Sequence, residues 1–340
     1  MKVQRQWIEI INIMYCSRLR ELDISKGLAI LLVVSGHLLS RCYENSVPWY
    51  FTYRSIIYQF HIAFFFFLAG ITFALVLNKA GGTYNYLLFI RKRAFRFIPS
   101  YIVLSIAIYL GKLFAQNLNL LVENPIINYW DLLSAFYYPN ASAIEYLWFI
   151  YVLLLYYITV PLFISISNNR HIFLILITVL ISLIPGTGLF AFNNYQFYLF
   201  YFIVGYIIYY NYGFYINIIN KYGFLFILLF ILILMTVCVL KIPKVAVGFF
   251  CIPGLYALSR LILLSNKHVI LEYIGKHTFT IYLFHEIFIG LSKVFLLKII
   301  PLNKTSFVLY FIILIPVSVF IPIYLKEKIF KRYRLLNKYF

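Results

Sequence analysis

Long apolar runs separated by short polar intervals make up most of this chain. Runs of about 18 or more apolar residues are long enough to cross a bilayer as helices. The runs lack the strict apolar–polar alternation that transmembrane β-strands require. The pattern therefore predicts an all-α, polytopic membrane helix bundle with about ten transmembrane helices, at residues 22–40, 55–78, 97–115, 146–166, 172–190, 196–212, 223–240, 245–264, 278–297 and 307–325.

The same pattern predicts a simple organisation along the chain. We expect a cytoplasmic segment at 1–20, one transmembrane domain at 21–325 and a basic cytoplasmic tail at 326–340. The tail is expected to lie on the membrane surface, facing anionic lipid. The polar interval at about 116–145 is expected outside the membrane, either as a cap on the bundle or as a loop facing a substrate. We expect no cleavable signal peptide, so the first helix is an uncleaved anchor.

Composition supports the membrane assignment. Of 340 residues, 64% are hydrophobic and 11% are charged, whereas an ordinary soluble domain has about 25% charged residues. The chain therefore has too little polar surface for a soluble globule, and we expect a multi-pass protein of a cell membrane, such as a bacterial inner membrane or a plasma membrane.

The formal net charge of +19 is explained by topology and does not predict nucleic-acid binding. With both termini in the cytoplasm, 21 of the 29 Lys and Arg residues lie on the cytoplasmic side of the predicted helices, and the other 8 lie outside. This asymmetry is the bias that positively charged residues show in membrane proteins.

The first predicted helix carries three ionisable residues on an otherwise apolar surface, Asp23, Lys26 and His37. Lys26 and His37 are 11 residues apart, about three helical turns, so their side chains are expected on one face. Asp23 precedes Lys26 by three residues and lies near the same line. Because an ionisable group inside a bilayer costs about 2.5–3.5 kcal/mol, such residues are functional candidates.

Each of these three residues also has a structural interpretation. Lys26 can extend to the cytoplasmic surface as an anchor, and Asp23 can cap the helix or pair with Lys26. A neutral His37 can bridge two helices. In the functional interpretation His37 accepts a proton, since imidazole exchanges protons near neutral pH.

Further polar residues interrupt other predicted helices. His61 lies near the outer end of the second helix, and His285 and Glu286 lie together in the ninth. Each histidine alone is interpreted most simply as structural, but several in one bundle favour a polar cavity.

A cytoplasmic cluster of cations precedes the third helix: Arg91, Lys92, Arg93 and Arg96. These charges can serve only to set the topology. Alternatively, they can bind the phosphates of a nucleotide, for which the planar arginine side chain is well suited. No Gly-rich phosphate-binding motif is present, so side chains and helix ends would hold such a ligand. The four cysteines lack metal-ligand spacing, and no metal site is predicted. We also expect no permanently bound cofactor.

In order along the chain, these residues resemble the motifs of the acyltransferase 3 family of membrane O-acyltransferases. The first helix of that family has a basic residue, ten intervening residues and a histidine, which correspond to Lys26 and His37. Two differences are Lys26 and Ala69, where many members have arginine and serine. The other matching segments, which extend the resemblance over about 18–300, are FHIAFFFFLAG, Arg93-Ala-Phe-Arg96 with Pro99 and Tyr101, Tyr146-Leu-Trp148-Phe149, Ile274-Gly275-Lys276 and Tyr282-Leu283-Phe284-His285.

The resemblance implies transfer of an acyl group, usually acetyl from acetyl-CoA, to a sugar hydroxyl of a cell-envelope glycan or lipid-linked saccharide. The arrangement of residues fits this reaction, and our hypothesis is that His37 accepts the proton of the attacking hydroxyl, with Asp23 and Lys26 orienting the cavity or contacting the donor. Arg91, Lys92, Arg93 and Arg96 would hold the CoA phosphates. His61, Trp148, His285 and Glu286 would line the substrate cavity. The alternatives are a membrane exporter of a polysaccharide or small solute, and a scaffold subunit of an envelope-synthesis complex.

Overall fold

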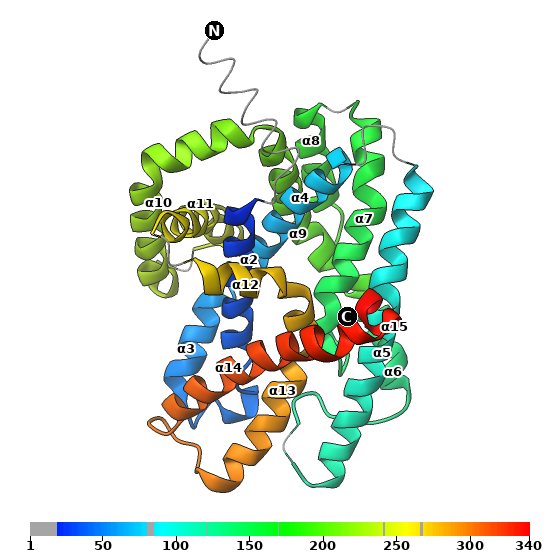
Figure 1. Ribbon diagram of the computed structural model, residues 1–340, viewed down its shortest axis with the longest axis vertical. Coiled ribbons are helices and arrows are strands. Elements are labelled where there is room, and N and C mark those ends of the chain that lie inside the picture. The colour runs from blue at the N-terminus through cyan, green and yellow to red at the C-terminus, as the bar shows by residue number, and fades with distance from the viewer. Residues whose placement is uncertain (1–18, 80–84, 121, 169, 241, 266–267) are drawn as a thin grey trace. The chain divides into compact units, whose positions relative to one another are not determined.

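The computed structural model describes residues 19–79, 85–120, 122–168, 170–240, 242–265 and 268–340, and its regular elements are all helical (Figure 1). The predicted all-α class is therefore confirmed, whereas most of the predicted N-terminal segment at 1–20 lies outside the described residues. The α-helices are α2 (Arg20–Gly36), α3 (Pro48–Ile57), α4 (His61–Lys79), α5 (Tyr86–Asn117), α6 (Trp130–Tyr137), α7 (Trp148–Ile166), α8 (His171–Ser182), α9 (Phe192–Tyr210), α10 (Tyr212–Leu240), α11 (Lys244–Leu264), α12 (Val269–Lys276), α13 (Thr278–Ile299), α14 (Phe307–Tyr324) and α15 (Arg334–Tyr339).

Each of the ten predicted segments overlaps a helix. Within the described residues, seven helical stretches are long and apolar enough to cross a membrane, and the first of them contains both α3 and α4. They are Pro48–Lys79, Tyr86–Asn117, Glu145–Ile166, Tyr212–Val237, Lys244–Leu264, Thr278–Ile299 and Phe307–Arg332. The protein is thus a multi-pass membrane protein. The number of spans stays a prediction, because α8 has only 12 residues and α2 only 17. The cytoplasmic location of the termini also stays a prediction.

Helix α5 begins eleven residues earlier than the sequence pattern predicts, at Tyr86 instead of residue 97. The side chain of Asn85 caps it by accepting a hydrogen bond from the Leu88 N–H, at 3.0 Å. Pro99 therefore lies inside the helix and not at its start. The sequence pattern places the start of the helix too far along the chain, because the cluster of cations in this stretch lowers the local hydropathy. Lysine and arginine are nevertheless good helix formers.

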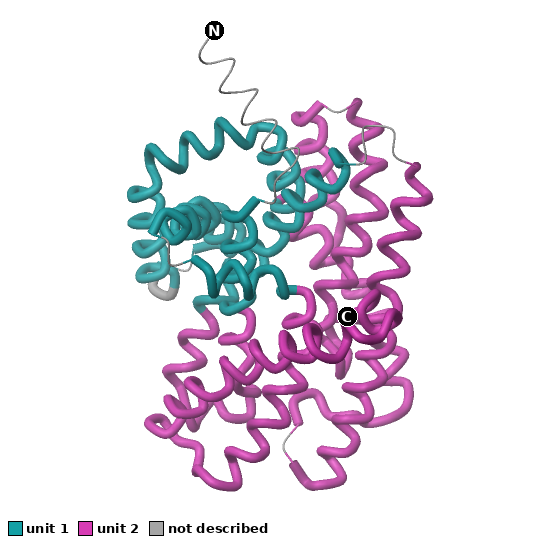
Figure 2. The backbone as a smooth tube through the Cα atoms, in the orientation of Figure 1, with its two compact units in different colours: residues 1–32, 56–84, 201–278 teal, residues 33–55, 85–200, 279–340 magenta. Residues whose placement is uncertain are grey.

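Two compact units make up the chain (Figure 2). Unit 1 contains residues 1–32, 56–84 and 201–278, and unit 2 contains residues 33–55, 85–200 and 279–340. Helix α2 passes from unit 1 to unit 2 after Leu32. The division into a 21–325 transmembrane domain and flanking segments stays a prediction.

In unit 1, glycines let helices α4 and α9 approach to backbone contact. A Cβ atom at Gly70 would lie 2.0 Å from the carbonyl oxygen of Phe202, and one at Gly205 would lie 2.0 Å from that of Phe67. Carbon and oxygen atoms cannot approach so closely without a shift of backbone. The final glycine of the FFFFLAG segment is thus needed for helix packing, as small residues commonly are in membranes.

A second close crossing in unit 1 joins α2 to α12. A Cβ atom at Gly275 would lie 1.8 Å from the Asp23 carbonyl oxygen. Beside this crossing, the Glu272 carboxylate accepts from Arg20 Nε at 3.1 Å and pairs with Lys276 Nζ at 2.7 Å. The hydrogen bond from Lys276, helped by Arg20, lowers the pKa of the Glu272 carboxyl below its ordinary value. The Ile274-Gly275-Lys276 segment therefore has a structural role at this crossing.

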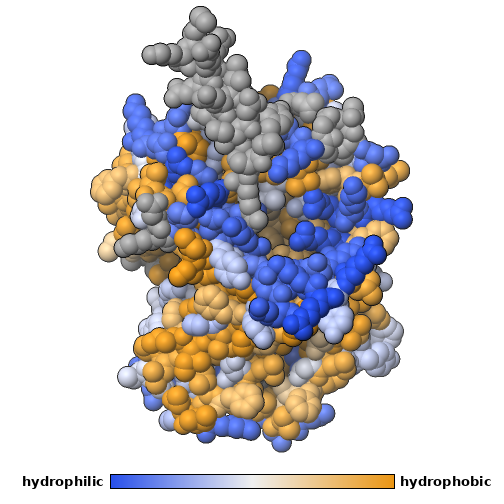
Figure 3. Space-filling view, in the orientation of Figure 1, coloured by the Kyte–Doolittle hydropathy of each residue, from blue (hydrophilic) through white to orange (hydrophobic). Residues whose placement is uncertain are grey.

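In unit 2, the C-terminal segment packs against α5 and α13. Ser100 Oγ donates to the Tyr339 carbonyl oxygen, and Thr280 Oγ1 donates to that of Phe340, each at 2.7 Å. Hydrophilic side chains gather over this segment, whereas apolar side chains cover the outward face of α14 (Figure 3). The exposed apolar residues of α14 are those expected to contact lipid, among them Val308, Leu309, Ile312 and Phe320.

Candidate functional site

His37 lies immediately after the last residue of α2, in unit 2. Its backbone N–H donates to the Val34 carbonyl oxygen at 3.1 Å, in a tight final turn. The side chain is half-buried, with 23% of its surface exposed. The predicted helix at 22–40 is therefore shorter in the structure, and His37 stands at its end, where its ring is accessible.

Helix α3 fixes the backbone on both sides of His37. The Tyr50 hydroxyl accepts from the Leu38 N–H at 2.9 Å and donates to the Ser35 carbonyl oxygen at 3.1 Å. These hydrogen bonds satisfy backbone groups that the end of α2 leaves unpaired. Two more α3 side chains act on the same turn: Tyr53, which donates to Ser35 Oγ at 2.8 Å, and Arg54, which donates to the Leu39 carbonyl oxygen at 3.0 Å.

Helix α13 brings His285 and Glu286 to His37. The Glu286 carboxylate contacts His37 Nδ1 directly, and the His285 ring lies edge-on to the His37 ring with 5.4 Å between ring centres. His285 is fully buried, and its Nδ1–H donates to the Tyr282 carbonyl oxygen at 2.8 Å. Its other ring nitrogen, Nε2, is buried and has no hydrogen-bond partner among the residues that the structure describes. The sequence predicted these residues as cavity residues but did not predict their contact with His37.

The residues before α7 hold this part of α13 in place. The Tyr282 hydroxyl donates to the Tyr146 carbonyl oxygen, and the Tyr146 hydroxyl donates to the Leu283 carbonyl oxygen at 3.3 Å. The Tyr146 ring also lies against His285, with 5.8 Å between ring centres. The two tyrosines therefore form a reciprocal clamp, which fixes the orientation of His285 and Glu286.

Three charged residues that were not predicted as site residues interact with this group: Lys112, Glu145 and Lys293. Glu145 interacts electrostatically with His37, and Lys112 and Lys293 interact with Glu286. Lys112 Nζ also donates to the Glu123 carbonyl oxygen at 2.6 Å. The sequence pattern explains both lysines as charges that set the topology. Lys112 and Lys293 could have been predicted as site residues because each lies within or beside an apolar run, where a charge is costly.

Aromatic rings hold the predicted cation cluster of α5. Arg93 lies over the Tyr157 ring of α7 at 5.3 Å, and Arg96 lies over the Phe279 ring of α13 at 4.9 Å. Such cation–π contacts orient a guanidinium group and leave its N–H groups able to bind an anion. The other two members of the cluster, Arg91 and Lys92, are exposed.

One helix links the cation cluster to His37. Phe279, which Arg96 contacts, and Glu286, which His37 contacts, are seven residues apart on α13. At about 1.5 Å of rise per residue, this spacing corresponds to about 10 Å along the helix axis. The cation cluster and His37 therefore both contact α13, at two positions along the same helix.

The remaining predicted residues are divided between the two units. Asp23, Lys26 and His61 belong to unit 1, where Asp23 is buried and Lys26 is half-buried. His61 is buried, and its Nδ1–H donates to the Ile57 carbonyl oxygen at 2.8 Å. Trp148 belongs to unit 2 and stacks on Tyr198, with 5.6 Å between ring centres. Whether Asp23, Lys26 and His61 act with His37 stays a prediction.

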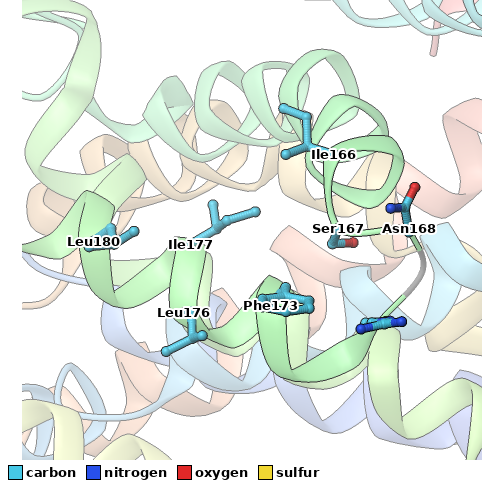
Figure 4. Close-up of a pocket in the computed structure, with 8 residues that line it drawn as sticks. Ile166, Ser167, Asn168, Phe173, Leu176, Ile177 and Leu180 are labelled. Carbon is cyan, nitrogen blue, oxygen red and sulfur yellow. The ribbon is translucent and has the colours of Figure 1, made fainter.

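A groove between the end of α7 and α8 contains none of the predicted site residues (Figure 4). Its volume is about 410 Å³. Apolar side chains of α8, such as Leu176 and Leu180, form its walls, and Ser167 and Asn168 lie at one end. The groove therefore lacks the group of ionisable side chains that the His37 region has.

Cys42, five residues after His37, does not add a nucleophile to the site. Partial desolvation raises the pKa of its thiol above the ordinary value, although nearby Lys293 opposes the shift. The thiol is therefore protonated at neutral pH, and a protonated thiol is a poor nucleophile.

Comparison with known protein families identifies this chain's domain. The family model described as an acyltransferase domain, acyltransferase 3, matches residues 19–327. No curated protein and no solved structure matches the chain. The matched range includes every predicted site residue.

Proposed function

Since the chain belongs to the acyltransferase 3 family, we propose that it moves an acetyl group from acetyl-CoA to a sugar hydroxyl of a cell-envelope glycan or lipid-linked saccharide. Family membership makes the protein a membrane acyltransferase, which uses an acyl donor and an acceptor. The observation that carries the finer proposal is the contact between the His37 imidazole and the Glu286 carboxylate.

His37 is the general base of the proposed reaction. In the tautomer whose Nδ1–H is donated to Glu286, Nε2 is the nitrogen that carries the lone pair, and it accepts the proton of the attacking hydroxyl. Glu286 fixes this tautomer and balances the positive charge that His37 gains, as the third member of a nucleophile–base–carboxylate arrangement does. The hydroxyl oxygen attacks the thioester carbonyl carbon, the carbon–sulfur bond breaks, and the CoA thiolate receives the proton.

The acyl donor binds at the cation cluster in this proposal. Arg93 and Arg96, together with Arg91 and Lys92, pair with the CoA phosphates at the cytoplasmic side. The thioester arm then extends along α13 toward His37. The aromatic contacts of Arg93 and Arg96 support this role, because an oriented guanidinium group loses less freedom when it binds phosphate.

The acceptor sugar meets the acyl group beside His37. Glu145 and Lys112 are the charged residues best suited to bind sugar hydroxyls there, since both interact electrostatically with the His37–Glu286 pair. His285 supports the His37 ring, and Trp148 offers an aromatic face. The roles proposed for Asp23 and Lys26 are to orient the cavity or contact the donor, and the role proposed for His61 is to line the cavity.

An assay of the purified protein distinguishes the enzyme from an exporter. We expect the protein in lipid vesicles to release CoA from acetyl-CoA only when envelope glycan is supplied, and the glycan to gain one acetyl unit in its mass spectrum. An exporter would instead move glycan across the vesicle membrane without consuming acetyl-CoA. Glycan flux without any acetylation would contradict the proposal.

Replacing one arginine of the cluster tests the donor site. We expect Arg96→Ala to raise the KM for acetyl-CoA about tenfold or more, because a charge-assisted hydrogen bond to phosphate contributes about 1.5–3 kcal/mol. The kcat should change little, since the phosphates are bound equally before and during the reaction. Initial rates at varied acetyl-CoA concentration measure both constants.

Arg170→Ala is the matched control for this variant. Arg170 is another exposed arginine that is predicted to lie in the cytoplasm, but it is located in the groove beside α8. If the cluster only sets the topology, both variants should have the same small effect on KM. An unchanged KM in Arg96→Ala would remove this residue from the donor site.

A further inference from the structure

We propose that His37, His285 and Glu286 form a binding site for a divalent transition metal, with Zn²⁺ as the best-suited ion. One donor atom from each of these side chains lies within 4.8 Å of the other two. All three residues belong to unit 2, so the grouping does not depend on how the two units are placed. Two imidazoles and one carboxylate are a ligand set that zinc uses in proteins, with a fourth position left for water.

The surroundings of His285 favour metal binding. A metal-binding histidine usually donates its second ring N–H to a carbonyl or carboxylate, which fixes the tautomer and the direction of the ligating nitrogen. His285 Nδ1 makes this hydrogen bond with the Tyr282 carbonyl oxygen, at 2.8 Å. The Nε2 lone pair is then the ligating one, and this buried atom has no hydrogen-bond partner in the described part of the chain. An acceptor buried without a partner is costly, and a bound cation removes that cost.

The other two ligands are accessible. The side chains of His37 and Glu286 are 23% and 27% exposed, so an ion can reach them and keep a water molecule. The Tyr146–Tyr282 clamp holds the α13 ligands, and α3 holds the turn that presents His37. Ligands that are held in place before the metal arrives lose little freedom on binding, which raises affinity.

Metal occupancy would stop acyl transfer, and this consequence rests on the proposed function. A zinc ion bound through His37 Nδ1 takes the position of the proton that His37 shares with Glu286. The ring must then carry its proton on Nε2, where it can donate a hydrogen bond but cannot accept the hydroxyl proton. Zinc bound through Nε2 uses the same lone pair directly. Either geometry makes zinc an inhibitor that competes with the base.

Metal binding is measured on the purified full chain, independently of activity. We expect one Zn²⁺ per chain in competition with a chromophoric chelator, and an X-ray absorption spectrum of the wild type with two imidazole ligands. His285→Gln and Glu286→Gln should each weaken Zn²⁺ binding about tenfold or more. His171→Gln, which replaces a histidine at the start of α8, is the matched control and should bind as the wild type does.

The outcomes separate the metal site from the proposed function. Absence of stoichiometric Zn²⁺ binding, a spectrum with fewer than two imidazoles, or equal affinity in His285→Gln and Glu286→Gln would overturn the metal site and leave the acyltransferase proposal intact. Binding that depends on these residues supports the site. If zinc binds there and acyl transfer continues unchanged, the site stands and His37 is not the base.

Discussion

His37→Ala is expected to lower the kcat for glycan acetylation by about 10²- to 10⁴-fold, which is the usual contribution of a general base. Ala removes the only group in the proposed mechanism that accepts the hydroxyl proton. The KM for acetyl-CoA should change little, because the donor phosphates bind at the α5 cations. The measurement is the initial rate of acetyl transfer by purified protein, at matched amounts of monodisperse protein.

Glu286→Gln tests the contribution of the carboxylate to the His37–Glu286 pair. Gln has nearly the same shape as Glu but is neutral, so it cannot balance the charge on His37. Its amide N–H can also donate to Nδ1, which would leave the proton on Nε2 and select the wrong tautomer. We expect a loss in kcat that approaches the His37→Ala loss, and a double variant that is little worse than either single variant.

His171→Gln serves as the control for both variants and should retain full activity. Acetylation by His37→Ala at the wild-type rate would exclude His37 from the chemical step. If Glu286→Gln retained full activity while His37→Ala lost it, His37 would still act as the base, but without help from the carboxylate.

Gly70→Ala and Gly205→Ala are expected to destabilise the protein by more than about 3 kcal/mol, at the upper end of overpacking effects. The new methyl carbon would lie 2.0 Å from a backbone carbonyl oxygen of the facing helix at either position. Backbone atoms cannot rotate away as a side chain can, so α4 and α9 must separate and lose contacts along their length. The measurement is the thermal unfolding temperature in detergent, with the yield of monodisperse protein.

Gly111→Ala is the matched control for these substitutions, since it makes the same change inside another long helix. Apart from its chain neighbours and the backbone of its own helix, no described atom lies within 4 Å of a Cβ atom at Gly111. Ala should be neutral there, or more stable by up to about 1 kcal/mol, because it favours the helix more than Gly does. Equal unfolding temperatures for Gly70→Ala and Gly111→Ala would show that the α4–α9 crossing has room for a methyl group.

The helical class was predictable because apolar run length is a strong signal in membrane proteins. The boundaries were less predictable where charge and helix coincide, as in the first three turns of α5. The pairing of Gly70 with Gly205 was not predictable, since it depends on which helices become neighbours, and that information is not local. The motif glycines show the same limit, because the sequence indicates a small residue but not the carbonyl oxygen that it faces.

The candidate site was predictable in its parts but not in its contacts. His37, His285 and Glu286 were identified because ionisable groups are rare in apolar runs. Their association was not predictable, since about 250 residues separate His37 from the other two. Lys112 and Lys293 were missed because a lysine near a helix end has a sufficient explanation in topology. Whether Lys26 and His37 act together depends on α2, whose two parts belong to different units.

The attachment of the His37 turn to α3 has a thermodynamic consequence. Tyr50, Tyr53 and Arg54 bind the peptide groups and the serine that flank the imidazole, so the conformational entropy of this turn is lost during folding and not when substrate arrives. The activation entropy of the chemical step should therefore be small, and it should become more negative in Tyr50→Phe, in which the turn must be ordered anew in each catalytic cycle.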